Sequence, residues 1–331
     1  MKWASRLVDH FEPEVDQGSR ALFFGAVGVI LVWCLTSLPA SAANVFSGVG
    51  GGTTTASGAV SALSTDFEGD ASFFGNGSFK SSNHSNGSIS EIEASAGGIL
   101  SWQVRDNLLL DFGAQWQRFS FDPDPRVPVP DVLQEVNLVV GADFQLTPAV
   151  IMHLEMDPGI YSDFQNISSG SFFVPIEIGG VYFVSSDLLF AFGVSINYER
   201  NPPVFPGGGV RWQVTNKFLV NAILPKPQLE YKLTDKLTAH AGANLLGNDF
   251  RVSGDLASSR MAPKKLNNAI LEYTEVRVGG GLNYRLRPGM SLDLEAGFTP
   301  YRKFDYPRAD SFKVLSTDIA PYVQIAISAK F

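Results

Sequence analysis

The chain has 331 residues, a net charge of −8 and a single cysteine, and 45% of its residues are hydrophobic. The negative charge argues against nucleic acid as a partner, and the mean hydropathy of +0.06 excludes a protein built mainly from membrane-spanning helices. Glycine (32) and phenylalanine (25) are abundant, which is typical of strands that approach closely and carry aromatic side chains on one face.

The first predicted element is an apolar run over residues 21–38, followed by a short segment of small residues. Ala40 and Ala42 fit the small-residue pattern of a signal-peptide cleavage site. We therefore expect an export signal over residues 1–42 that is cleaved before Ala43. The alternative is a retained transmembrane helix, because a run of about 18 apolar residues can just cross a bilayer.

Residues 43–69 are rich in glycine, serine, threonine and alanine. This composition predicts a flexible N-terminal linker, which is too short and polar to form a plug domain. The remaining residues, 70–331, are predicted to form a single folded domain.

Within this domain, apolar and polar residues alternate with a period of two, the pattern of strands with one apolar face. In residues 188–199, Phe190 and Phe192 fall on one face, whereas Ser195 and Asn197 fall on the other. A single strand of this kind is equally typical of a soluble sheet with one wet face. About ten in series behind an export signal favour a membrane barrel, which must close because lipid cannot satisfy a free sheet edge.

The connections between these segments alternate between short and long. The long ones are polar or proline-rich, and the short ones contain the turn-forming residues Asn, Asp, Pro and Gly. Alternation places all short turns on one side of the membrane, as in outer-membrane barrels with tight periplasmic turns and longer external loops. The short turns are predicted at 104–107, 146–149, 184–187, 214–217, 233–236 and 286–289.

The last segment, residues 319–331, also alternates and ends on the aromatic Phe331. It resembles the closing strand of bacterial outer-membrane barrels, in which the terminal aromatic strand is read by the barrel-assembly machinery. Six turns join twelve strands, and this strand makes thirteen. Closure with both ends in the periplasm needs an even number, so a further strand is expected near residues 71–80. The prediction is an all-β, closed antiparallel transmembrane barrel of about fourteen strands, with twelve as the alternative.

The weakest part of this pattern is residues 218–233. Here the segment Pro225-Lys226-Pro227 separates two strands of about seven residues, fewer than the roughly 9–11 that cross a bilayer. We expect these two strands to be short or to lie partly outside the bilayer.

If the apolar face meets lipid, the polar face lines the barrel interior. Charges of both signs on that face need water or each other, so two interpretations stay open. The charges form an ion-pair network that fills the lumen, or they line a water-filled pore and set its selectivity. The candidate lumen-facing residues are Asp111, Asp143, His153, Glu155, Glu177, Glu199, Arg211, Glu275, Arg277, Arg285, Asp293 and Glu295.

The histidines give little support for catalysis. His153, Glu155 and Asp157 share one strand face, which would suit a metal or an acid–base role. Outer-membrane barrel hydrolases, however, pair a histidine with a serine at the lipid interface, and His153 and His240 are both predicted to point inward. We therefore predict no enzyme activity, no metal site and no cofactor.

Several stretches resemble a family of uncharacterised predicted Gram-negative outer-membrane β-barrel proteins, which are porin-like. The stretches are residues 138–164, 224–231 and 266–277, and the resemblance covers most of residues 90–331. It implies the barrel fold and an outer-membrane location surrounded by lipid. It assigns no substrate and no active site.

The charged inner face leads to the functional hypothesis of a passive channel for small polar solutes of unknown identity. A first alternative is an uptake channel for apolar compounds, as in fourteen-stranded fatty-acid transporter-like barrels, although those carry a substantial N-terminal plug. A second is a non-conducting structural or adhesive barrel that acts through its loops.

Overall fold

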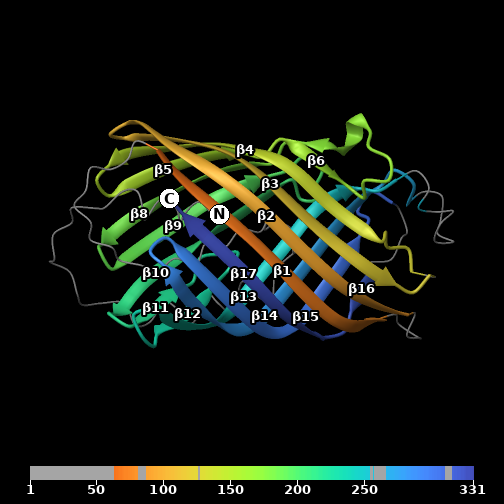
Figure 1. The fold of residues 1–331 in the computed structure, drawn as a ribbon. Helices are drawn as coiled ribbons and strands as arrows, with labels where there is room; N and C mark the ends of the chain where they lie inside the picture. The colour runs from red at the N-terminus through yellow and green to blue at the C-terminus, as the bar shows by residue number, and fades with distance from the viewer. Residues whose placement is uncertain (1–62, 81–86, 126, 254–255, 257–265, 310–314) are drawn as a thin grey trace.

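A computed structural model describes residues 63–80, 87–125, 127–253, 256, 266–309 and 315–331, and it shows one closed antiparallel sheet (Figure 1). The predicted export signal and most of the predicted linker lie outside the described residues. The strands are β1 (Leu63–Lys80), β2 (Ser88–Arg105), β3 (Leu108–Pro123), β4 (Val132–Thr147), β5 (Val150–Met156), β6 (Gly159–Ser162), β7 (Phe172–Phe173), β8 (Ile176–Ser185), β9 (Leu188–Ile196), β10 (Val204–Thr215), β11 (Phe218–Asn221), β12 (Gln228–Lys232), β13 (Leu237–Arg251), β14 (Ile270–Arg287), β15 (Met290–Asp305), β16 (Leu315–Thr317) and β17 (Ala320–Lys330), with a short 3-10 helix, η1 (Ser169–Ser171).

Three barrel strands are each interrupted once, as β5 and β6, β7 and β8, and β16 and β17, so the 17 segments form a barrel of 14 strands. The sheet closes because β1 pairs antiparallel with β2 on one side and with β17 on the other. This confirms the predicted fold and strand number. No helix among these residues is long and apolar enough to cross a membrane.

The predicted boundary between linker and barrel is wrong by several residues. β1 begins at Leu63, so residues 63–69 belong to the barrel wall. Their polar, glycine-containing composition is that of a linker, but Ser64 pairs with Ser101 of β2, and Asp66 pairs with Lys330 of β17. Backbone pairing with two long neighbours overrides the weak strand propensity of these residues.

The outer surface of the sheet is apolar. Phe112, Phe192 and Phe298 are 44%, 46% and 58% exposed, whereas Asp111, next to Phe112 on the opposite face, is 1% exposed. A belt of large exposed apolar side chains around a closed sheet is the surface that lipid covers. The sheet therefore spans a membrane, with its polar side chains directed inward.

All six predicted short turns connect strands at the end of the barrel that also holds both ends of the sheet. The turn between β14 and β15 shows why its sequence is restricted. Gly289 has a φ of +75°, a backbone conformation that side chains disfavour. The Gly289 carbonyl also accepts a hydrogen bond from the Lys330 backbone N–H at 2.6 Å, which ties this turn to the closing strand.

The wall is incomplete where β11 and β12 form a short hairpin, as expected for this part of the chain. The hairpin tip lies between β10 and β13: the Leu224 N–H donates to the Gly208 carbonyl at 3.3 Å, and the Leu245 N–H donates to the Pro225 carbonyl at 2.9 Å. Beyond this tip no described strand lies between β10 and β13. We call this break in the ladder the seam.

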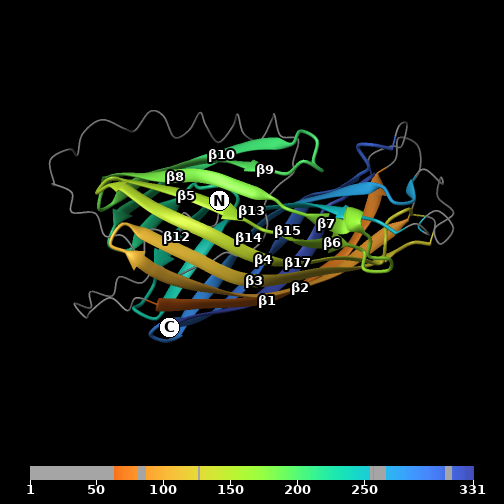
Figure 2. The same cartoon turned by 90° about the horizontal axis from the view of Figure 1, so that it is seen from above.

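The outer half of β13 turns into the barrel beneath the neighbouring strands. Arg251 of β13 pairs in parallel with Ser162 of β6, although β7 to β12 separate these two strands in the wall. β8, β9 and β10 therefore form an arch over the outer half of β13, along one side of the barrel in Figure 2.

Glu199 was expected on a strand, but β9 ends at Ile196, and Glu199 lies in the connection to β10. The strand ends because the Asn197 side-chain carbonyl accepts the Glu199 backbone N–H at 3.1 Å, a local turn that competes with the ladder. Pro202 and Pro203 follow and cannot donate to a ladder.

Candidate functional site

The barrel interior is the candidate site, and eleven of the twelve predicted lumen residues lie on the inner face of strands, Glu199 being the exception. Their role in selectivity stays a prediction. Eight are buried, namely Asp111, Asp143, His153, Glu155, Glu275, Arg277, Asp293 and Glu295, and three are half-buried, namely Glu177, Arg211 and Arg285.

A layer of five charged side chains joins β14 and β15 to β2 through the barrel interior, and we call it the ion-pair layer. Arg277 of β14 pairs with Glu93 of β2 and with Glu275. Arg302 of β15 pairs with Glu91 of β2 at 3.1 Å and with Glu275 at 3.0 Å. β15, β17 and β1 separate β14 from β2 in the wall, so these contacts cross the lumen, and all five side chains are 0% exposed.

Aromatic groups support this layer from both sides. The Tyr273 hydroxyl hydrogen-bonds to Glu91 at 2.9 Å and to Glu275 at 2.8 Å. The guanidinium groups of Arg277 and Arg302 lie 4.5 and 5.1 Å from the centre of the Phe74 ring, a favourable arrangement for a cation. The charges therefore fill the lumen instead of lining open water at this level.

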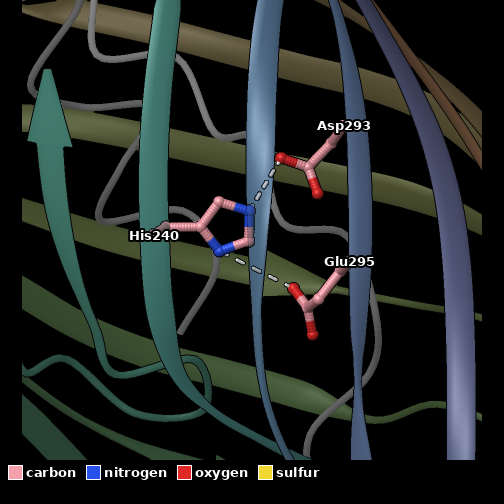
Figure 3. Close-up of side chains that lie close together, drawn as sticks. All are labelled: His240, Asp293 and Glu295. Atoms are coloured by element: carbon pink, nitrogen blue, oxygen red, sulfur yellow. Dashed lines mark hydrogen bonds and ion pairs between the residues drawn. The ribbon is translucent and has the colours of Figure 1, made fainter. Parts of the chain in front are cut away.

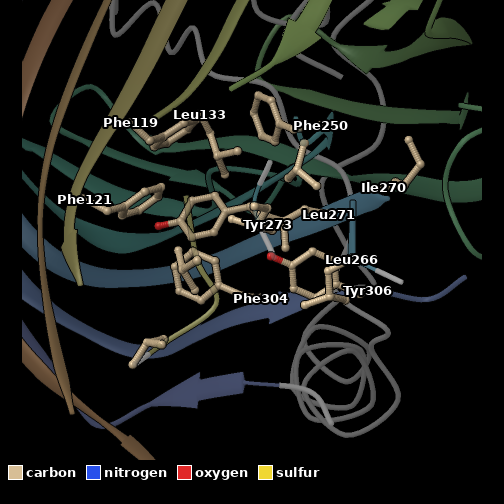
Figure 4. Packing of buried hydrophobic residues seen from close by; sticks show 14 of the residues in the cluster. Phe119, Phe121, Leu133, Phe250, Leu266, Ile270, Leu271, Tyr273, Phe304 and Tyr306 are labelled. Carbon is tan, nitrogen blue, oxygen red and sulfur yellow. The ribbon is translucent and has the colours of Figure 1, made fainter. Parts of the chain in front are cut away.

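An aromatic cluster fills the outer half of the lumen, and we call it the aromatic plug (Figure 4). Its rings come from facing walls: Phe119 and Phe121 of β3, Phe250 of β13, Tyr273 of β14 and Phe304 of β15. The ring centres of Phe119 and Tyr273 are 5.0 Å apart, those of Phe121 and Phe304 5.3 Å, and those of Phe119 and Phe250 6.1 Å. These contacts close the axis of the barrel above the ion-pair layer.

Residues from the outer connections complete the plug, among them Val127, Leu266 and Tyr306. The Tyr306 hydroxyl donates to the Pro128 carbonyl at 2.7 Å. Burial raises the pKa of this hydroxyl above its ordinary value, with the charge of Asp163 acting in the same direction, so Tyr306 keeps the proton that it donates.

A histidine and two carboxylates lie together on the periplasmic side of the ion-pair layer (Figure 3). His240 of β13 places Nε2 at 3.0 Å from Asp293 Oδ2 and Nδ1 at 3.8 Å from Glu295 Oε2, both on β15. The imidazole reaches across β14 because Gly281 lies between them, where a Cβ would be 2.6 Å from His240 Nε2.

These three residues offer ligand atoms within 4.8 Å of one another, as a metal site would. However, the two carboxylates lie at different ring nitrogens, and one metal ion cannot bind both nitrogens of a ring. Lys226 Nζ is also 3.9 Å from Glu295 Oε2, and the Tyr322 hydroxyl donates to Glu295 Oε1 at 2.5 Å. The arrangement therefore fits a histidine that bridges two carboxylates better than it fits a bound cation.

Replacing Gly281 by alanine is expected to displace the His240 ring and to destabilise the barrel by about 1–3 kcal/mol, the usual cost of overpacking. Gly69→Ala is the matched control, because a Cβ there would meet the Ser95 carbonyl at an ordinary 3.4 Å. Urea unfolding in lipid vesicles measures the free energy of unfolding of both variants. Equal stability of the two variants would contradict the close packing of the His240 ring over Gly281.

The second histidine cluster lies on β4 and β5. His153 Nδ1 hydrogen-bonds to Asp143, and His153 Nε2 lies 3.8 Å from Glu155. On the neighbouring strands, the Ser101 hydroxyl donates to Asp111 at 2.5 Å. The structure thus joins three predicted lumen residues, Asp143, His153 and Glu155, in one buried polar cluster. A fourth, Asp111, makes a separate buried contact with Ser101.

The periplasmic end of the lumen is polar and less tightly filled. A cavity of about 30 Å³ is bordered by Asp70, Lys226, Asp293, Gln324 and Ser328, among other residues. The half-buried Arg211 and Arg285 lie toward this end of the barrel, close to the periplasmic ends of β10 and β14.

Sequence reasoning missed three members of the ion-pair layer. Glu91 and Glu93 alternate with the lipid-facing Ile92, so the period of two would have found them. Arg302 gave no such signal. The pairing of β15 with β14 shifts between Val276 and Val278, and this bulge reverses which residues of β15 face inward.

Residues 62–329 match the model of a family described as a domain of unknown function, DUF6268. The chain belongs to this family. None of the curated proteins matches it.

Among solved structures, the DUF6268 chain is similar to the TodX monoaromatic hydrocarbon channel deltaS2 mutant, with 8% identity, a TM-score of 0.44, and coverage of 82% of this chain and 90% of that one. It is similar to the COG4313 outer membrane channel from Pseudomonas putida F1, with 11% identity, a TM-score of 0.42, and coverage of 81% and 95%. It is also similar to the NanC porin, with 12% identity, a TM-score of 0.36, and coverage of 81% of this chain and 100% of that one. At these identities the likeness is one of fold alone.

Phe331 of this DUF6268 protein lies just after the closing strand. Its backbone N–H and carbonyl both hydrogen-bond to Thr65 of β1 at 2.9 Å, and its ring meets the Phe67 ring edge-on at 6.3 Å. Phe331 is 65% exposed, so it contributes little to the core. Its role as the signal for the barrel-assembly machinery stays a prediction.

Deleting Phe331 is expected to slow assembly, because it removes two bonds that join β17 to β1 as well as the terminal aromatic ring. The measurement is the rate at which newly made protein acquires the heat-modifiable gel mobility of a folded barrel. Phe331→Tyr, which keeps the ring, should assemble like the wild type. A normal surface level of the deletion variant would count against the signal.

Proposed function

We propose that this protein is a gated channel of the outer membrane for small compounds with apolar parts. The observation that carries the proposal is the aromatic plug, which presents an apolar surface to a solute entering from the outer side. The interior of an eight-stranded barrel is just wide enough for side chains to fill. A barrel of fourteen strands encloses a wider interior. Here side chains close that space, and side chains can rearrange.

The expected passive pore for small polar solutes fits this geometry less well. An open aqueous pore needs charges that face water, whereas the ion-pair layer is fully buried and pairs across the lumen. We keep polar solutes as the second candidate cargo because Asp70, Glu177 and Arg211 are only half-buried on the inner face. In either case, the predicted export signal would deliver the chain to the outer membrane.

Uptake measurements in cells and in vesicles separate the candidates. Cells that make the protein should take up the apolar dye N-phenyl-1-naphthylamine faster than cells with an empty vector, and liposomes holding the protein should swell slowly in arabinose. In planar bilayers with KCl, we expect rare and small conductance steps. Fast arabinose entry without dye uptake would favour the polar channel. The absence of all three signals would favour a structural or adhesive barrel.

A further inference from the structure

The β10 side of the seam is an unpaired strand edge. Odd-numbered residues at both ends of β10 bond toward β9; for example, the Gln213 N–H donates to the Asp187 carbonyl at 2.8 Å. Even-numbered residues therefore direct their backbone groups to the other side. Gly208 still meets the hairpin tip there, but Val204 and Pro206 face no strand among the described residues.

The β13 side is also an edge over part of its length. Beyond Leu245, the backbone groups of Gly247 and Asp249 point toward the seam. The Asp249 N–H donates to a side chain, Asn248 Oδ1 at 3.0 Å. Backbone pairing on this side resumes only at Arg251, whose carbonyl accepts a hydrogen bond from the Asp163 N–H at 3.3 Å.

The sequence is adapted to such an edge. An unpaired backbone group in lipid is strongly unfavourable, and Pro206 has no N–H to leave unpaired. Proline in a sheet is confined to edges, strand starts and bulges, and Pro206 is the third residue of β10, where it fits an unpaired edge near the start of that strand.

The lumen face behind the seam carries no side chains at one level. Gly179 of β8 pairs with Gly193 of β9, which pairs with Gly207 of β10. The residue opposite Gly179 in β5 is His153, so this face lies beside the polar wall of the lumen. Three aligned glycines give the arch a smooth inner surface next to the seam.

The connection between β9 and β10 bridges the seam at its outer end, and we call residues 197–203 the latch. Asn197 Nδ2 donates to Asp249 Oδ2 at 2.8 Å, and Arg200 Nε lies 3.4 Å from the same oxygen. The Asn201 N–H donates to Glu272 Oε1 at 2.8 Å. These contacts join the β9–β10 hairpin to β13 and β14.

We propose that the seam between β10 and β13 is a lateral gate, held shut by the latch, through which compounds with apolar parts pass between the lumen and the membrane. This inference rests on the proposed function. Opening the seam breaks the contacts of the latch, which include the ion pairs of Glu199 with Arg251 and Arg308, but no strand ladder. An axial path would have to separate both the aromatic plug and the ion-pair layer, whose buried charges are strongly destabilised when they lose their partners.

The test joins the latch covalently to β13. Asn197→Cys and Asp249→Cys are combined in a Cys34→Ser background and linked with a short bifunctional methanethiosulfonate reagent, which a reductant removes. Uptake of N-phenyl-1-naphthylamine should fall to the level of empty-vector cells when the pair is linked. It should return to at least the wild-type rate on reduction, because both latch contacts to Asp249 are then absent.

The matched control pair is Ser291→Cys with Ser328→Cys. Their hydroxyl oxygens are 2.8 Å apart on β15 and β17, neighbouring strands that are already joined by a ladder, so linking them should leave uptake unchanged. Heat-modifiable gel mobility verifies that both pairs fold. Undiminished uptake by the linked Asn197–Asp249 pair would overturn the lateral gate while leaving the channel function intact. Dye uptake no faster than in empty-vector cells, for wild-type protein, would overturn both.

A milder variant tests the same idea without cysteines. Asn197→Ala removes one bond to Asp249 and should speed dye uptake with the fold retained. The control is Asn283→Ala, which loses a comparable bond to Ser291 Oγ at 3.3 Å far from the seam. Equal uptake by these two variants would overturn the role of the latch.

Discussion

Replacing Arg277 by methionine is expected to destabilise the barrel by about 3–5 kcal/mol, the usual cost of removing one partner from a buried ion pair. Arg277 is 0% exposed and contacts both Glu93 and Glu275. Without it, three buried carboxylates would share the one remaining arginine of the ion-pair layer, Arg302. The penalty arises from burying unpaired negative charge.

Urea unfolding of the refolded protein in lipid vesicles measures this change. Arg285→Met is the matched control, because Arg285 lies on the same strand and face but is half-buried; it should change the free energy of unfolding far less. Adding Glu93→Gln to Arg277→Met should recover part of the loss. Equal effects of the two arginine substitutions would show that Arg277 contributes no more stability than a half-buried arginine on the same face.

Replacing Phe119 by alanine is expected to open the aromatic plug and to destabilise the protein by about 3–5 kcal/mol, as for other buried phenylalanines. Phe119 is 2% exposed and contacts Phe121, Phe250 and Tyr273 at once. Its removal leaves a cavity at the centre of the aromatic plug. Conductance steps in planar bilayers should become more frequent, because only the ion-pair layer then has to separate along the axis.

The control is Phe112→Ala on the same strand, because Phe112 faces lipid and is 44% exposed. It should leave conductance unchanged and cost less stability. A Phe119→Ala protein that is destabilised but conducts like the wild type would mean that the plug is only core packing. That outcome would remove the main support for an axial gate, and it would leave the lateral gate as the route to test.

Most of the wall could be predicted because its determinant is local. Lipid outside and polar groups inside select one residue type at every second position, so Phe112 beside Asp111 already shows which face is which. The turns are equally local, since residues such as Pro288 and Gly289 set the backbone direction by themselves. The even strand number then follows from closure.

The site was less predictable because it depends on where the period of two is interrupted. The bulge between Val276 and Val278 brings Arg302 inward, and the shift between Phe74 and Gly77 does the same for Phe79. Which charges meet across the lumen depends on strands that lie far apart in sequence, as for Arg277 and Glu93.

By itself, the sequence determined that this is a closed transmembrane barrel, which residues face lipid where the period of two is uninterrupted, and that the β11–β12 hairpin is short. These follow from period, turn chemistry and strand length, all of which act over a few residues. Only the tertiary structure decided that the lumen is closed by an ion-pair layer and an aromatic plug, and that the wall has a seam under a latch. These depend on how far β13 turns inward and on which side chains then meet, and no local pattern specifies that.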